Sequence, residues 1–435
     1  MVSATAAQSG TAWSVPLAIG SYTTNSVKTL AISHRILSTL SGHIELPLLA
    51  AEAEAAAAGS SGAGAVQPVY SFNHGATGFY RVLYSPSLLS ALSTLIRLGS
   101  LPALDRLSLL RDCFSLSACG LGYDVAHLLD LLLLFDAEEN FTVLQFLCVV
   151  LGGVAGLHQG QDYYPQLQRL VGRLLAPRWA KLGWGPAPAP GQAGQRGAAK
   201  EHHLTMLERS MLLSLLGAHG SPDVADALQQ RAFAMLSDFV ADPAGRPIQP
   251  DLRGPVYALA IKARGQAARD LLIQLYGSSA SSEERVRVLS ALGTTRGRAD
   301  TAESDAADTE RLLSWVFESG AVRTGDLIYV LSSVGQDSAA SRRRCWAYMQ
   351  SHWEALMARF RGAMFVLGRI LPSVLGEMSS AAEVDEFERW FAAHPAVGAE
   401  RSVRQSAETV RMKAERLARE APVIAQWVSA HAEQL

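Results

Sequence analysis

The eleven histidines are the first residues in this chain that could do chemistry. Two histidines four positions apart on a helix, with a glutamate between them in the order HExxH, bind zinc and activate a water molecule. That motif does not occur, and no histidine has another three or four residues away. His202 and His203 are adjacent, so on a helix their side chains would point about 100° apart. We interpret them as surface residues next to a linker rather than as metal ligands.

Other catalytic patterns are also missing from the sequence. It contains no GxSxG nucleophile motif and no GxxxxGK phosphate loop, and its four cysteines show no CxxC spacing. The glycine-rich run 75–78 precedes a strand-like segment rather than a helix, so it favours a tight turn over a phosphate site. A dispersed Cys/His site stays open at this point. We predict no catalytic, metal-binding or cofactor-binding residue in this chain.

Composition and charge narrow the class of protein. A hydrophobic share of 49% can bury a large core, and a net charge of −2 gives no bulk attraction to nucleic acid or to anionic membranes. Unpaired cysteines and the lack of a signal-peptide pattern at the start predict a cytoplasmic protein. The longest apolar run, 141–157, is too short to span a membrane and predicts a buried helix. We therefore expect neither a nucleic acid nor a membrane partner.

The pattern of the sequence changes at Ser85-Pro86, which is a good helix start. Before it, short β-branched runs with frequent turn residues, including 82–84, predict strands of a small β-sandwich in 1–84, with a flexible insertion at 50–66. After it, apolar residues recur at helical spacing to the end of the chain. The fold class predicted is mainly α: a small incomplete β-sandwich followed by a HEAT/armadillo-like right-handed α-solenoid of helix pairs in 85–435. Two exposed loops are predicted, at 185–199 and 294–309.

The last stretch carries apolar residues spaced in sevens, at Val403, Val410, Leu417 and Ile424. This spacing is typical of a coiled coil that binds a partner. Alanines at the positions between them, together with Pro422, favour close packing against a neighbouring helix instead.

Several segments, all in the same order, resemble the zinc aminopeptidases that include puromycin-sensitive aminopeptidase and aminopeptidase N. The segments are 13–17 (WSVPL), 75–84 (GATGFYRVLY), 101–107 (LPALDRL), 139–143 (ENFTV), 251–257 (DLRGPVY), Trp353-Glu354 with Arg359-Phe360 and Gly362, and Phe391 with His394-Pro395. The resemblance covers about residues 11 to 430 and corresponds to the third, β-sandwich domain and the C-terminal helical domain of that family. The family's catalytic domain, its first sandwich strands, and the polar residues of the helix after Asn140 have no counterpart here.

The resemblance implies a set of structural residues and partners. It places a junction between sandwich and helices at Thr77, Gly78, Phe79, Tyr80 and Arg81, together with Asp105 and Arg106, and it suggests Arg253 and Tyr257 for the concave face of the helical domain. Zinc would belong to the missing catalytic domain, which would be a partner in cis or in trans, and peptides would be the ligands.

Three functions follow as hypotheses. The chain is the non-catalytic C-terminal part of a zinc metalloaminopeptidase, which caps the active-site cleft and limits peptide access in peptide catabolism. Alternatively, it is a stand-alone, catalytically inactive helical module that binds peptides or a protein. The third hypothesis is a peptidase with an unrecognised site.

Overall fold

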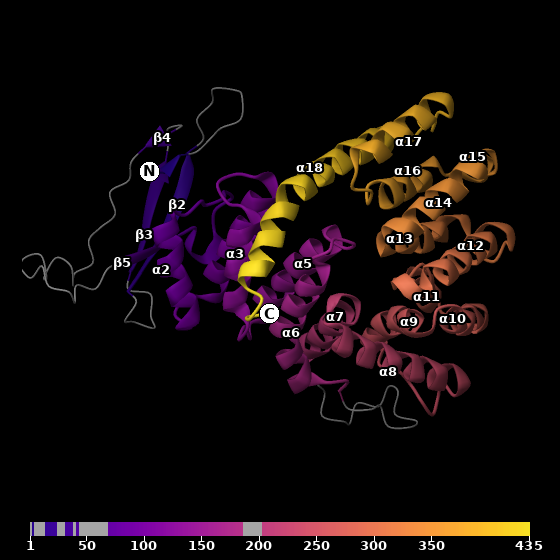
Figure 1. The fold of residues 1–435 in the computed structure, drawn as a ribbon, viewed down its shortest axis with the longest axis horizontal. Coiled ribbons are helices and arrows are strands. Elements are labelled where there is room, and N and C mark those ends of the chain that lie inside the picture. The colour runs from indigo at the N-terminus through magenta and orange to yellow at the C-terminus, as the bar shows by residue number, and fades with distance from the viewer. Residues whose placement is uncertain (1, 4–13, 24–30, 38–40, 43–67, 186–201) are drawn as a thin grey trace, which may run out of the picture. The chain divides into compact units, whose positions relative to one another are not determined.

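A computed structural model describes residues 2–3, 14–23, 31–37, 41–42, 68–185 and 202–435. The chain divides into two compact units, which we call unit 1 (Met1–Val150) and unit 2 (Leu151–Leu435). The described part is mainly helical with a small sheet near its start, which confirms the predicted fold class (Figure 1). The predicted insertion at 50–66 lies outside the described residues, and so does the predicted loop at 185–199 apart from Gly185.

Unit 1 begins with a three-stranded antiparallel sheet in the order β3-β2-β5, next to a two-stranded pairing of β1 with β4. The strands are β1 (Val2–Ser3), β2 (Val15–Thr23), β3 (Ala31–Leu37), β4 (Ser41–Gly42) and β5 (Pro68–Phe72). Leu17, Ile19 and Leu37 form the core of the sheet, and Tyr80 packs against them. The edge strand β3 is largely exposed, and Ile32 and Ile36 are among its exposed residues.

Unit 1 has six helical elements among its described residues. They are η1 (His74–Ala76), α2 (Pro86–Arg97), α3 (Ala103–Cys119), α4 (Val125–Leu132), η2 (Leu133–Phe135) and α5 (Phe141–Leu157), and α5 continues into unit 2. Ser85 caps α2 by accepting a hydrogen bond from the Leu88 amide, and Pro86 is its first residue. The prediction of a strand at 82–84 was wrong, because this segment forms no ladder; the Val82 amide donates to Asp112 of α3 and the Tyr84 amide donates to the Tyr123 hydroxyl in the loop before α4. Since α2 contacts β5 and α3 contacts η1, these helices form one compact unit with the sheet although the strands end before residue 84.

Unit 2 is entirely helical in its described residues. Its helices are α6 (Tyr164–Leu182), α7 (His203–His219), α8 (Pro222–Ala241), α9 (Pro250–Arg264), α10 (Gln266–Ser278), α11 (Ser282–Leu292), η3 (Ala299–Thr301), α12 (Ala302–Glu318), η4 (Thr324–Asp326), α13 (Leu327–Asp337), α14 (Ala339–Ser351), α15 (Trp353–Phe360), α16 (Met364–Leu375), α17 (Ala381–Ala393) and α18 (Glu400–Ala430).

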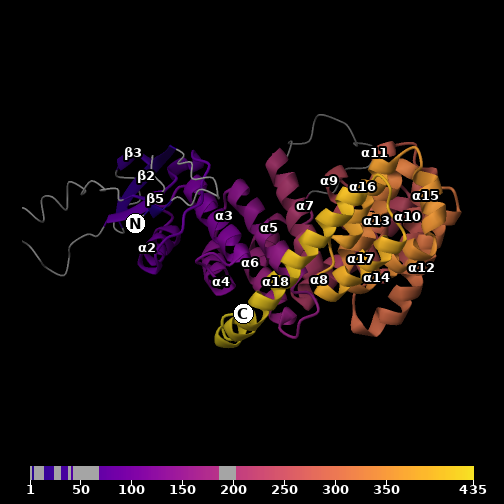
Figure 2. The same ribbon diagram turned by 90° about the horizontal axis from the view of Figure 1, so that it is seen from above.

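The helices of unit 2 stack in two rows (Figures 1 and 2). One row runs α7, α9, α11, α13, α16 and α18, each in contact with the next. The other row includes α8, α10, α12, α14 and α17, in which α8 contacts α10, Tyr276 of α10 packs against Trp315 of α12, α12 contacts α14, and Trp346 of α14 packs against Trp390 of α17. This is how pairs of helices stack into a layered array.

The last helix returns to the beginning of this array. Its N-terminal half packs on α16 and α17, with Val403 and Val410 buried, which confirms the packing interpretation of the sevenfold spacing. Further along, the Glu420 carboxylate lies 3.1 Å from Nε2 of His158, and both side chains are buried. With 31 residues, α18 is about 46 Å long. The helix α18 therefore spans from the end of the array to its start, and the array curves between these two ends (Figure 1).

The predicted loop at 294–309 needs a correction. Only 294–301 is irregular or 3-10, and α12 starts at Ala302. Asp305, Asp308 and Thr309 are buried, because their side chains bind the preceding segment and the helix backbone. The polar, alanine-rich composition of this segment suggested a loop. Its second half is instead the start of α12, where Asp305 and Asp308 bind groups of the preceding segment.

Candidate functional site

The described residues contain no constellation suited to catalysis by a metal. No three His, Cys, Asp or Glu side chains within them come together as metal ligands would. His202 accepts a hydrogen bond from the Leu204 amide and caps α7, in keeping with its interpretation as a surface residue. None of the helices in the described ranges is long and apolar enough to cross a membrane.

Asp105 lies at the junction between the sheet and the helices of unit 1. This carboxylate, fully buried on α3, accepts hydrogen bonds from the Tyr22 hydroxyl at 2.8 Å and the Gly75 amide at 2.6 Å. It also lies 2.7 Å from Nδ1 of His74. One side chain thus connects β2, η1 and α3, which is a structural role.

The turn at 73–78 is closed by its own side chains. Oδ1 of Asn73 accepts from the Gly78 amide at 2.7 Å, and Nδ2 of Asn73 donates to the Gly78 carbonyl at 3.1 Å. Gly75 has φ 70°, a left-handed conformation that favours glycine. The Thr77 hydroxyl contacts only the His74 carbonyl, at 3.4 Å. Asn73 therefore fixes the turn, while Thr77 contributes little.

Arg81 joins the turn to α3 from the other side. Its guanidinium lies 3.0 Å from Oδ1 of Asp112, whose other oxygen accepts from the Val82 amide at 3.0 Å. Burial raises the pKa of the Asp112 carboxyl, and the hydrogen bonds from Arg81 and Val82 oppose that rise. Phe79, by contrast, is fully exposed in unit 1 and packs on none of these residues.

Arg106 organises the entrance to α5. Its guanidinium forms two hydrogen bonds with the Glu138 carboxylate, at 2.8 and 2.7 Å, and a third with the Leu101 carbonyl at 2.6 Å. Glu138 also accepts from the Asn140 amide, and Oδ1 of Asn140 caps α5 by accepting from Thr142. Arg106 and Asp105 therefore pair with other segments and not with each other.

Tyr257 does not lie as predicted, and Arg253 is bound to a neighbouring helix. Tyr257 is fully buried, and its hydroxyl donates to the Glu284 carboxylate of α11. Arg253 lies 2.7 Å from the same carboxylate and over the Phe239 ring at 4.8 Å. Both residues join neighbouring helices, and the buried Tyr257 cannot line a surface. The reason is that the Glu284 carboxylate of α11 binds both side chains.

Some partners in these networks were missed from the sequence. His74, Tyr22 and Glu138 complete the junction, and Glu284 completes the contact between α9 and α11. These residues lie 31 to 83 positions from their partners, or 27 to 31 positions in the case of Glu284. No local spacing signals such a pairing.

Comparison with known proteins identifies the family to which the chain belongs. Residues 69–412 match the family described as ERAP1-like C-terminal domain, which is more than three quarters of the chain. The chain belongs to this family. Among its relatives are Aminopeptidase M1-C of Oryza sativa subsp. japonica and Aminopeptidase M1 of Arabidopsis thaliana, each 26% identical over 92% and 78% of this chain, respectively. Alanine/arginine aminopeptidase of Saccharomyces cerevisiae is 22% identical over 83% of the chain.

The chain spans only part of these relatives. It covers 42% of the length of the rice protein, 36% of the Arabidopsis protein and 39% of the yeast protein. The matched region starts in β5 and includes all helices from α2 to α17. The resemblance found in the sequence is thus confirmed at the level of the family.

Proposed function

We propose that this chain is the non-catalytic C-terminal part of a cytoplasmic aminopeptidase, where it caps the active-site cleft and limits access of peptides. The observation that carries the proposal is the family match across residues 69–412, combined with relatives that are named aminopeptidases and are more than twice as long. The catalytic part would be a partner in cis or in trans, and peptides would be the ligands.

The construction of unit 2 supports the capping role. Two rows of helices are bridged from end to end by α18, so the array has a concave side. Curved arrays of helix pairs commonly bind their ligands on that side. A rigid curved wall suits a part that limits the size of what reaches a neighbouring cleft.

A catalytic zinc ion does not fit the residues of this chain. The sequence has no HExxH motif, and the described residues bring together no set of three ligands. We therefore assign the zinc chemistry to the catalytic part and derive no step of hydrolysis from this chain.

The test uses the protein purified from its own cells through a tag on α18, with an aminoacyl reporter and peptides of 5 and 20 residues as substrates. The variant His158→Ala removes the contact of α18 with the start of the array, and His394→Ala changes an exposed histidine of unit 2 as a control. Capping predicts that His158→Ala alters the ratio of the 20-residue rate to the reporter rate, while the control keeps the wild-type ratio.

Two results would contradict the proposal. One is purified protein without any aminopeptidase activity, which would favour the stand-alone binding module. The other is activity whose dependence on peptide length is the same in the wild type and in His158→Ala, although hydrogen exchange shows that α18 has been loosened.

A further inference from the structure

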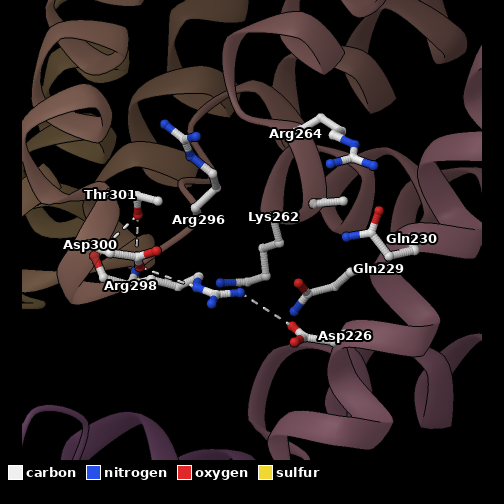
Figure 3. A pocket seen from close by; sticks show the side chains of 10 residues that line it. Asp226, Gln229, Gln230, Lys262, Arg264, Arg296, Arg298, Asp300 and Thr301 are labelled. Atoms are coloured by element: carbon white, nitrogen blue, oxygen red, sulfur yellow. Dashed lines mark hydrogen bonds and ion pairs between the residues drawn. The ribbon is translucent and has the colours of Figure 1, made fainter.

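A pocket of about 240 Å³ opens at one edge of unit 2 (Figure 3). It lies where the C-terminal end of α9 meets the N-terminal half of α8 and the segment between α11 and α12. Its charged lining consists of Lys262, Arg264, Arg296, Arg298, Asp226 and Asp300. Four cations and two carboxylates thus line the pocket, and two further carboxylates, Asp305 and Asp308, lie beside Arg296.

Arg296 and Arg298 both form ion pairs with aspartates, and the two sets of ion pairs differ in burial. Arg296 lies 3.2 Å from Asp305 and 3.8 Å from Asp308, both largely buried behind the wall of the pocket. Arg298 lies 3.3 Å from Asp300 and 3.7 Å from Asp226, and the side chains of all three are more than half exposed. Exposed pairs of this kind are weak. Arg298 can therefore turn to another anion, whereas Arg296 is fixed.

The other two cations of the pocket are Lys262 and Arg264. Within the described part of the chain, neither forms an ion pair with a carboxylate. The Lys262 ammonium is 3.5 Å from the Thr295 carbonyl, and the Arg264 guanidinium lies 5.7 Å from the centre of the Phe233 ring. The charge of Lys262 also affects its surroundings, because burial and then Lys262 lower the pKa of His219 to about 4.

The segment 294–301, which carries Arg296 and Arg298, is fixed by hydrogen bonds to side chains outside the pocket. Asp305 accepts from the Gly297 amide at 3.0 Å and from the Thr301 hydroxyl at 2.9 Å. The buried Arg269 donates to the Thr294 carbonyl at 2.6 Å. The segment is thus built by internal hydrogen bonds, and its donors are in place before any ligand arrives.

We propose that this pocket binds a phosphate group. A dianion would balance Lys262 and Arg264, which have no carboxylate partner in the described residues, and a tetrahedral group offers oxygens to donors that come from different directions. Lys262 and Arg264 of α9 and Arg298 of the facing segment supply such donors; in Figure 3 Lys262 reaches towards Arg298, and Arg264 lies on the side of Gln230. Guanidinium groups bind phosphate in a forked geometry, and lysine binds it as a point charge. A flat carboxylate would use fewer of these donors. The site does not depend on the proposed role in an aminopeptidase.

The test is calorimetric titration of the full chain with inorganic pyrophosphate at low salt, with succinate as a dicarboxylate for comparison. We expect saturable binding with a Kd of roughly 0.05 to 1 mM, weaker binding of succinate, and loss of affinity as salt is raised. Lys262→Gln and Arg264→Gln should each weaken binding about tenfold. Asp226→Asn should strengthen it a few-fold, because it removes a competing anion and frees Arg298.

Arg231→Gln is the matched control, since Arg231 is exposed on the same helix as Asp226 but does not line the pocket. Melting temperatures without ligand establish that each variant is folded. Absence of saturable pyrophosphate binding would overturn the proposal. So would equal weakening by Arg231→Gln and Lys262→Gln, which would mean diffuse attraction, or succinate binding as tightly as pyrophosphate.

Discussion

Replacing Asp105 with alanine should loosen the joint between the sheet and α3 in unit 1. The carboxylate is fully buried and accepts from the Tyr22 hydroxyl and the Gly75 amide, with Nδ1 of His74 2.7 Å away. Alanine removes all of these contacts and leaves the Gly75 amide without the carboxylate to which it donates. Asparagine keeps the size of the side chain and one oxygen for Gly75, but loses the negative charge.

The expected size of the effect follows from these contacts. A hydrogen bond to a charged group contributes about 1.5–3 kcal/mol, and contributions within one network do not add fully. Removing one partner of a buried charged network costs about 3–5 kcal/mol. We expect Asp105→Ala to lie in that range and Asp105→Asn to cost about 1–2 kcal/mol, because part of the network survives.

Hydrogen–deuterium exchange of the backbone amides in residues 68–84 measures the loss of local stability caused by the Asp105 variants. A loss of 3–5 kcal/mol corresponds to exchange that is roughly a hundredfold to several thousandfold faster through local opening. Asp136→Ala, at an exposed position of unit 1, is the control and should change exchange little. If Asp105→Ala changed protection by less than about 1 kcal/mol, the idea that this carboxylate holds the joint would be refuted.

Two further predictions concern ion pairs and pH. Arg81→Ala should cost about 1 kcal/mol, because the Arg81 side chain is 45% exposed. Asp112→Ala should cost about 3 kcal/mol, because it also leaves the half-buried Val82 amide without its acceptor. Equal shifts in melting temperature for the two variants would contradict this. The pKa of His219 is lowered to about 4, mainly by burial. Between about pH 6.5 and pH 4, His219 is therefore protonated in the unfolded chain but neutral in the folded chain. Stability of unit 2 should therefore fall as the pH is lowered from 6.5 towards 4, by about 2 kcal/mol at pH 5, and His219→Gln should remove this part of the slope in urea unfolding.

Much of the architecture could be predicted because its signals are local. The helix start at Ser85-Pro86 depends on a cap and a proline side by side, and the packing of α18 depends on small and apolar residues at fixed spacing. The collinear motifs identified the family before any coordinates. The junction residues Asp105, Arg106 and Arg81 were found through those motifs and not through their charges.

What could not be predicted depends on partners far along the chain. Tyr257 is buried because Glu284 on another helix binds its hydroxyl, and no residue near Tyr257 in the sequence predicts this contact. The segment at 302–309 is a helix because Asp305 and Asp308 find cationic partners, although its composition is that of a loop. The phosphate pocket joins α8, α9 and a connecting segment, so its cations are separated in sequence by up to 36 positions.

The most direct test of the central claim is to isolate the native protein from its cells with an antibody to unit 2 and to determine the masses and sequences of what is recovered. The account predicts that unit 2 is recovered together with a zinc-binding HExxH sequence, either in one polypeptide about twice the 46.5 kDa of this chain or in a second polypeptide bound to it. It also predicts that this material releases amino acids from aminoacyl reporters. Recovery of a 46.5 kDa protein alone, with no HExxH partner and no turnover, would contradict it.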